Sequence, residues 1–93
     1  MEIGEVGQIG FTNGLAHAME NDKELFKQVH AAWFKYMTCD WGILGDDDKQ
    51  MNDSAVKNKN DRILARYNTK AGDIYIITEW DRSYTTFMFC NEY

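Results

Sequence analysis

The last third of the chain alternates between apolar and polar positions with the two-residue period of a β-strand. Three runs rich in β-branched and aromatic residues cover residues 62–67, 73–80 and 84–90. Such stiff side chains suit the pleated surface of a sheet. Gly72 lies between the first two runs and Asp81 between the last two, and both residues favour tight turns. The pattern therefore predicts three consecutive antiparallel strands.

The alternation also assigns the two faces of this sheet. Ile74 and Ile76 share one face, which we expect to be the core. The opposite face carries Tyr75, Ile77 and Met88, and it is more apolar than a solvated face needs. Two interpretations stay open. Either the N-terminal segment or a second copy of the chain covers this face, or it binds a partner through aromatic and Met side chains.

The residues before the sheet predict helices that cover it. The clearest helix begins at residues 21–24, with Asn21 as its cap, and ends near Thr38. Its apolar residues recur at helical spacing and include Trp33. We therefore expect this helix to lie across the sheet with Trp33 in the core.

Two shorter helices and an extended segment complete the predicted fold. One helix covers residues 12–20, and the other runs from the aspartates at 46–48, one of which we expect to cap it, to about residue 58. Residues 1–11 alternate weakly, and we expect them along the edge of the sheet. The chain 1–93 then forms one α+β domain: a three-stranded antiparallel meander, with a candidate fourth edge strand from the N-terminus, covered by two to three helices.

Composition and charge narrow the classes of function. The 93 residues carry a net charge of −5 at pH 7, and the sequence pI is near 4.8. Direct binding of nucleic acid needs clustered Lys and Arg. The negative net charge therefore argues against nucleic-acid binding and favours a protein partner with a basic surface. No stretch approaches the roughly 18 apolar residues of a membrane span, and the N-terminus does not read as a signal peptide. We therefore predict a cytoplasmic protein that does not associate with a membrane.

The residues that most often bind metals do not form a metal-binding pattern. Asp46, Asp47 and Asp48 lack the alternating ligands of a calcium loop, and the helix dipole explains acidic residues in a first helical turn. The histidines and cysteines lack the short ligand spacings of a zinc site. We expect Cys39 and Cys90 to be reduced and mostly buried. The sequence thus predicts no metal and no cofactor.

A denser polar cluster follows the middle strand at residues 79–83. Glu79, Asp81 and Arg82 combine two carboxylates with a guanidinium, a set that could serve an acid/base or phosphate site. The structural interpretation is that Asp81 and Ser83 are turn residues. Glu79 then pairs across the strands with Arg62 or Arg66. Both interpretations stay open at this point.

Several motifs occur together in the second half of the chain. They read Asp40-Trp41-Gly42, Asp48-Lys49, Asn52-Asp53, Arg62-Ile63-Leu64-Ala65-Arg66-Tyr67 and Ile76-Ile77-Thr78-Glu79-Trp80-Asp81-Arg82-Ser83-Tyr84-Thr85-Thr86, with a closing Glu92-Tyr93. In these residues the segment 40–93 resembles a family of small bacterial proteins carried by plasmids, phages and integrated elements. Two turns depart from the family pattern: Asn60-Asp61 replace a Gly before the first strand, and Cys90-Asn91 replace a Pro near the end.

The resemblance implies a context rather than a reaction. Small acidic proteins of mobile elements often resemble inhibitors of host defence, of anti-CRISPR or anti-restriction type, which occupy basic channels for nucleic acid. We predict a non-catalytic interaction protein of this kind. The alternatives are a structural or regulatory homodimer formed through the second sheet face, and an enzyme that uses the 79–83 cluster. The partner-binding candidates are Asp46, Asp47, Asp48, Tyr75, Glu79, Asp81 and Arg82.

Overall fold

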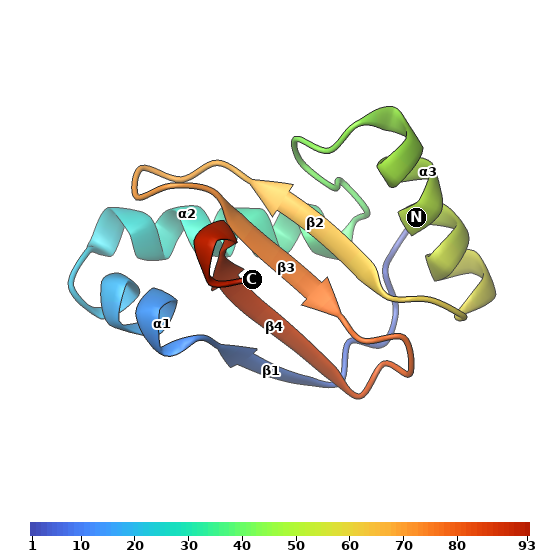
Figure 1. Ribbon diagram of the computed structural model, residues 1–93, viewed down its shortest axis with the longest axis horizontal. Coiled ribbons are helices and arrows are strands. Elements are labelled where there is room, and N and C mark those ends of the chain that lie inside the picture. The colour runs from blue at the N-terminus through green and yellow to red at the C-terminus, as the bar shows by residue number, and fades with distance from the viewer.

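Four strands form one mixed sheet in the spatial order β1-β4-β3-β2, and three helices surround it (Figure 1). The computed structural model describes all residues, 1–93. The elements in chain order are β1 (Gln8–Phe11), α1 (Asn13–Glu20), α2 (Lys23–Met37), α3 (Asp46–Asn58), β2 (Ile63–Tyr67), β3 (Ile74–Thr78), β4 (Tyr84–Phe89) and the 3-10 turn η1 (Cys90–Glu92). None of the helices combines the length and the apolar composition that a membrane crossing requires.

The sheet confirms the predicted α+β class and the antiparallel meander of β2, β3 and β4. The N-terminal segment supplies the fourth edge strand, and β1 runs parallel to β4 with Phe11 opposite Phe87. β3 is shorter than predicted and ends at Thr78, because the chain then enters a turn closed by a 3.0 Å hydrogen bond from the Glu79 N–H to the Tyr84 carbonyl.

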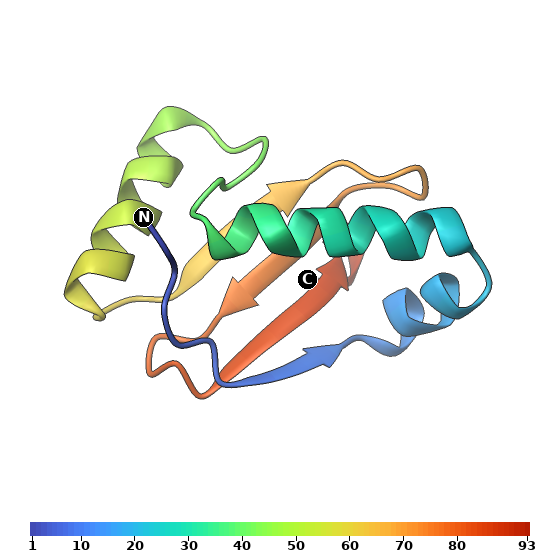
Figure 2. The ribbon, with the colours of Figure 1, turned by 180° about the vertical axis from the view of Figure 1, so that it is seen from behind.

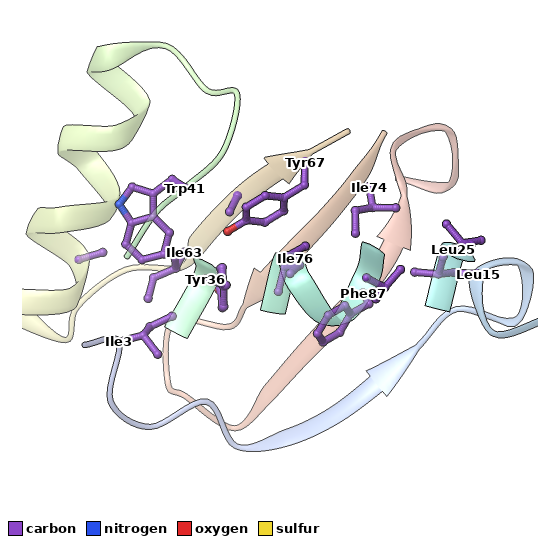
Figure 3. Packing of buried hydrophobic residues seen from close by; sticks show 14 residues of the cluster. Ile3, Leu15, Leu25, Tyr36, Trp41, Ile63, Tyr67, Ile74, Ile76 and Phe87 are labelled. Atoms are coloured by element: carbon purple, nitrogen blue, oxygen red, sulfur yellow. The ribbon is translucent and has the colours of Figure 1, made fainter. Parts of the chain in front are cut away.

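Helix α2 crosses the inner face of the sheet, and the core lies between them (Figures 2 and 3). Ile74 and Ile76, which the alternation placed on this face, are fully buried, and so is Tyr36 of α2. Trp33, which we expected in the core, is only half-buried, and Phe26 of the same apolar stripe is 47% exposed. Both lie on the side of α2 nearest β1, where the sheet ends and no further strand covers them.

A chain of buried hydroxyl groups links α2 to the sheet and to the N-terminal segment. Thr85 Oγ1 donates to the carbonyl oxygen of Val6 at 2.7 Å, because a carbonyl can only accept. The single hydroxyl hydrogen of Thr85 is thereby used, so Thr78 Oγ1 donates to Thr85 over 2.8 Å and Tyr36 Oη donates to Thr78 over 2.6 Å. Burial raises the pKa of Tyr36, so the phenol stays protonated and keeps its donor role. No buried side-chain nitrogen or oxygen of the protein lacks a partner.

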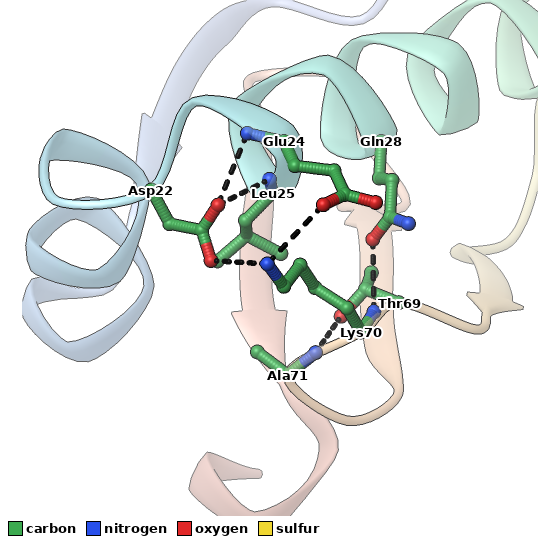
Figure 4. A network of polar contacts seen from close by, with 7 residues as sticks. All are labelled: Asp22, Glu24, Leu25, Gln28, Thr69, Lys70 and Ala71. Carbon is green, nitrogen blue, oxygen red and sulfur yellow. Dashed lines mark hydrogen bonds and ion pairs between the residues drawn. The ribbon is translucent and has the colours of Figure 1, made fainter.

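The N-terminus of α2 is tied to the turn between β2 and β3 (Figure 4). Asp22, one residue after the predicted cap Asn21, is the actual cap. Its carboxylate accepts the backbone N–H groups of Glu24 at 3.0 Å and Leu25 at 3.1 Å. Lys70 of the turn places its ammonium 3.1 Å from Asp22 and 3.3 Å from Glu24. The Leu25 N–H and the Lys70 ammonium hold the pKa of Asp22 below its usual value, so the cap stays ionised.

Helix α3 begins without a side-chain cap. Its N-cap is Gly45, and the predicted caps Asp46, Asp47 and Asp48 form the first helical turn instead. Gly45 has φ −68° and ψ 163°, a conformation open to any residue. A Cβ placed there would meet no atom within 4 Å. The position can therefore accept a side chain without strain.

Replacing Gly45 with Ser is expected to raise the free energy of unfolding by about 0.5–1 kcal/mol. The Ser hydroxyl can accept one of the free N–H groups of the first turn, and the unfolded chain loses conformational freedom. Urea denaturation followed by circular dichroism measures the change. Gly45→Ala is the matched control, since it restricts the unfolded chain without adding an acceptor. A Ser variant no more stable than the Ala variant would contradict the capping account.

Candidate functional site

A groove lies between α3 and the outer face of the sheet, the face that α2 leaves uncovered. Figure 1 looks onto this face of the sheet, with α3 beside β2. The volume of the groove is about 330 Å³. Residues from α3, β2, β3 and the flanking loops line it: Leu44, Asp48, Met51, Asn52, Asp61, Arg62, Leu64, Arg66 and Tyr75. The fold thus brings together Asp48 and Tyr75, two of the predicted partner-binding residues that lie far apart in the sequence.

Hydrogen bonds between side chains and backbone hold α3 beside β2. Asn52 donates its Nδ2 to the Leu64 carbonyl at 2.8 Å and accepts the Leu64 N–H at 3.3 Å. Trp41 Nε1 donates to Asp53 Oδ1 at 2.9 Å, which ties the loop before α3 to the same helix. Asn52 and Trp41 are buried. These contacts fix the helical wall of the groove relative to the sheet.

The acidic first turn of α3 is exposed to solvent, and its last aspartate lines the groove. Asp46, Asp47 and Asp48 are exposed, and none of them takes part in an ion pair. Free backbone N–H groups and the helix dipole favour negative charge at this end of a helix. Asp48 lines the groove, whereas Asp46 and Asp47 precede it on the exposed turn.

The two arginines of the groove are already engaged within the protein. Arg66 donates Nε and Nη2 to Asp73 Oδ2 at 3.0 and 2.7 Å, and its guanidinium lies 5.8 Å from the ring centroid of Tyr75. Asp73 raises the pKa of Arg66. Arg62 donates to the hydroxyl of Tyr93, whose ring meets Tyr75 edge-on with centroids 5.6 Å apart. The groove therefore presents carboxylates without an ion-pair partner. Of its two arginines, Arg66 is paired with Asp73, whereas Arg62 is hydrogen-bonded to a neutral hydroxyl.

Arg82 has a structural role in the turn after β3. The residue adopts φ 62°, and its guanidinium donates to several backbone carbonyls over 2.6 to 3.2 Å. Those carbonyls belong to Ala55, Asp61, Glu79 and Trp80. The contacts join the turn to α3 and to the loop before β2. Arg82 thus stabilises the packing of elements next to the groove and does not itself line the groove.

The two carboxylates of the 79–83 cluster also lie outside the groove. Asp81 accepts the N–H of Ser83 at 3.0 Å, as the turn interpretation predicts, and the Ser83 hydroxyl and N–H lower the pKa of Asp81. Glu79 is exposed and makes no ion pair, so its predicted pairing with an arginine is wrong; Arg66 pairs with Asp73 instead. The enzyme alternative needs these groups to converge in a concave pocket, and the Arg82 guanidinium is turned toward backbone carbonyls instead.

The C-terminal segment lies over the outer sheet face, which one of the two interpretations assigned to the N-terminal segment or a second copy (Figure 1). Tyr93 packs against Tyr75 there. Ile77 is only 5% exposed within the single chain, and Tyr75 and Met88 are half-buried. The apolar surface that the homodimer alternative required on this face is therefore largely covered by the chain itself.

Sequence reasoning missed several groove residues. Arg62, Leu64 and Arg66 alternate along β2, and this period was a signal that they share the outer face with Tyr75. The position of α3 had no such signal, because Asn52 recognises backbone groups twelve residues away and any residue offers the same groups.

The structure places no group of three or more His, Cys, Asp or Glu side chains where they could hold a metal ion. Cys39 and Cys90 are free thiols and are half-buried. Burial raises the pKa of both thiols, which lowers the fraction present as nucleophilic thiolate.

No protein-family model, no curated protein and no solved structure matches this chain. The resemblance to small proteins of mobile elements therefore stays a prediction, and its only support is the sequence motifs.

Proposed function

We propose that this protein is a non-catalytic interaction protein that binds a protein partner with a basic surface through the groove beside α3. The observation that carries the proposal is the placement of Asp48 and Tyr75 in one groove, where neither arginine is paired with Asp48: Arg66 binds Asp73 and Arg62 donates to the Tyr93 hydroxyl. A basic side chain of the partner would meet free carboxylates there, and an aromatic ring lies next to them.

The charge distribution supports this proposal. Only three of the fifteen acidic residues form ion pairs: Asp22, Glu24 and Asp73. The three aspartates that begin α3 are exposed and unpaired. Concentrated unpaired charge of one sign steers a partner of opposite sign and raises the rate of association.

Apolar side chains beside the acids supply contact area. Met51 is 63% exposed in the groove wall, and Ile43 in the preceding loop is 50% exposed. Protein interfaces are enriched in Met, Tyr and Arg at their centres and are polar at their rims. The groove has this composition, with Met51 and Tyr75 inside and Asp46 and Asp47 next to it.

The most concrete form of this proposal is inhibition of a host nucleic-acid defence complex in the cytoplasm, of anti-CRISPR or anti-restriction type. Exposed carboxylates at the end of a rigid helix could occupy the positions at which a basic channel binds the phosphate groups of nucleic acid. The resemblance of residues 40–93 to proteins of mobile elements supports the same context.

A triple variant tests the acidic turn. Asp46→Asn, Asp47→Asn and Asp48→Asn together are expected to weaken binding to the partner about 10- to 100-fold at low salt, since each exposed ion pair contributes about 0.5–1 kcal/mol. The partner is first captured from the native host on the tagged protein and eluted with salt. Calorimetry on the purified pair then gives the dissociation constants, and raising the salt should reduce the difference between the variants.

The matched control is Glu2→Gln, Glu5→Gln and Glu20→Gln, which changes the net charge equally at other exposed sites. It is expected to lose less affinity than the α3 variant at low salt, and to bind within about twofold of the native protein at physiological salt, where the Debye length of about 8 Å screens distant charges. Equal losses in both triple variants would contradict a role for the α3 turn. A partner that fails to lose nuclease or nucleic-acid binding activity in the complex would contradict the inhibitor form.

A further inference from the structure

The two edge strands of the sheet differ in whether their outward backbone groups have hydrogen-bond partners. At the β2 edge, the outward backbone groups of Leu64 pair with the side chain of Asn52. Those of Arg66 pair with the loop before α3: the Arg66 N–H donates to the Trp41 carbonyl at 3.2 Å, and the Arg66 carbonyl accepts the Ile43 N–H at 2.9 Å. The β2 edge is therefore closed to another strand.

The β1 edge is open. Gln8 donates its N–H to the Ser83 carbonyl at 3.1 Å, and Thr12 donates to the Phe87 carbonyl at 3.0 Å. Backbone groups in a strand point alternately to its two sides, so the N–H and C=O groups of Ile9 and Phe11 point away from β4. No side chain or loop of the protein bonds to them.

Apolar side chains surround this open edge. Ile9 and Phe11 are 47% and 41% exposed on the α2 side of the sheet. With α2 they form an apolar cleft of about 170 Å³, lined by Ile9, Phe11, Val29, His30, Trp33 and Phe87. The neighbouring Phe26 and Phe34 on α2 are 47% and 70% exposed. An open backbone edge flanked by exposed aromatic residues is the surface on which an added strand gains both hydrogen bonds and apolar burial.

We propose that β1 pairs antiparallel with β1 of a second copy of this chain, so that the two sheets join into one. A two-fold axis at Gly10 places Ile9 opposite Phe11 of the other copy and Phe11 opposite its Ile9. These are the residues whose backbone groups face outward, so every outward N–H and C=O of β1 gains a partner. The register that satisfies the edge is thus the register that two-fold symmetry requires.

The charge distribution favours a second copy as the occupant. Two molecules of net charge −5 repel, but neither β1 nor the lining of the apolar cleft contains a carboxylate. The only acid of α2, Glu24, lies on the other side of the helix, at Lys70 of the β2–β3 turn.

Analytical ultracentrifugation of the full chain over a range of concentrations tests this proposal. The native protein is expected to shift from its monomer mass of 10.8 kDa to twice that mass. Ile9→Lys, which puts a charge on the edge, is expected to raise the dissociation constant about tenfold or more. Ile43→Lys at the closed edge is the matched control, since Ile43 is 50% exposed and Ile9 is 47% exposed, and it should leave the dissociation constant within about twofold.

Hydrogen exchange gives a second, site-specific readout. In the dimer the amides of Ile9 and Phe11 are expected to become protected, with protection rising with protein concentration. Ile9→Pro removes the outward N–H and keeps the bonds of Gln8 and Thr12 to β4, so it should also favour the monomer. A monomer at every concentration, or a dimer that Ile9→Lys leaves intact, overturns the proposal. The first of these results would leave the edge to an extended segment of a different protein.

Discussion

Replacing Tyr36 with Ala is expected to lower the free energy of unfolding by about 3–5 kcal/mol. Tyr36 is fully buried. The centroid of its ring lies 5.9 Å from the ring centroid of Trp33 and 5.5 Å from that of Trp41. Its removal opens a cavity between α2 and the sheet and leaves the hydroxyl chain without its first donor. A domain of this size has a total stability of roughly 5–10 kcal/mol, so the variant should be close to unfolding at 37 °C. Urea denaturation followed by circular dichroism measures the change.

Tyr36→Phe separates the packing of the ring from the hydroxyl group. The Thr78 hydroxyl still donates to Thr85, so only its acceptor site loses a partner, and the expected cost is about 1 kcal/mol. Trp33→Ala is the comparison at a half-buried neighbour and should cost less than Tyr36→Ala. If Tyr36→Phe were as damaging as Tyr36→Ala, the packing account would be wrong and the hydrogen-bond chain would dominate.

Replacing Gly42 with Ala is expected to cost about 2–5 kcal/mol, the sum of a left-handed backbone penalty and local overpacking. Gly42 has φ 79°, and a Cβ at this position would lie 1.9 Å from the Arg66 carbonyl oxygen. That carbonyl accepts the Ile43 N–H, so the loop cannot move away without opening the β2 edge. The loop also carries Trp41, which is buried against Tyr36. The strain therefore spreads to the core and to the wall of the groove.

Gly45→Ala is the matched control for Gly42→Ala, because it makes the same change three residues later where a Cβ meets no atom within 4 Å. It should change the free energy of unfolding by less than about 1 kcal/mol. Hydrogen exchange at Ile43 and Arg66 then reports whether the β2 edge has opened in the Gly42 variant. Similar stabilities for the two Ala variants would show that the loop relaxes without strain.

The inner face of the sheet was predictable residue by residue. Ile63, Ile74, Ile76 and Phe87 are all buried where the two-residue period placed them, because side chains of a strand alternate between faces. The stripe of α2 also identified the right helix. It did not show which of its large residues reach the centre of the core, since Trp33 and Tyr36 are less than one turn apart. Tyr36 is fully buried, whereas Trp33 lines the cleft beside β1.

The candidate site was predictable only in part. Asp48 and Tyr75 followed from exposed acids at a helix start and from an apolar outer face. Their convergence was not predictable, because it depends on where α3 docks, and Asn52 fixes that through the backbone of Leu64. Arg82 was a candidate for chemistry by residue type alone, and its structural role depends on carbonyls from α3 and from two turns.

By itself, the sequence determined the secondary-structure elements, the inner face of the sheet and the acidic character of the α3 turn. Each of these depends on residues close together in the chain, where spacing and side-chain chemistry are decisive. The tertiary structure alone decided that β1 lies parallel to β4, that one sheet edge is closed and the other open, and that the groove forms. The reason is physical: these features depend on hydrogen bonds between backbone groups, and every residue except proline offers the same N–H and C=O.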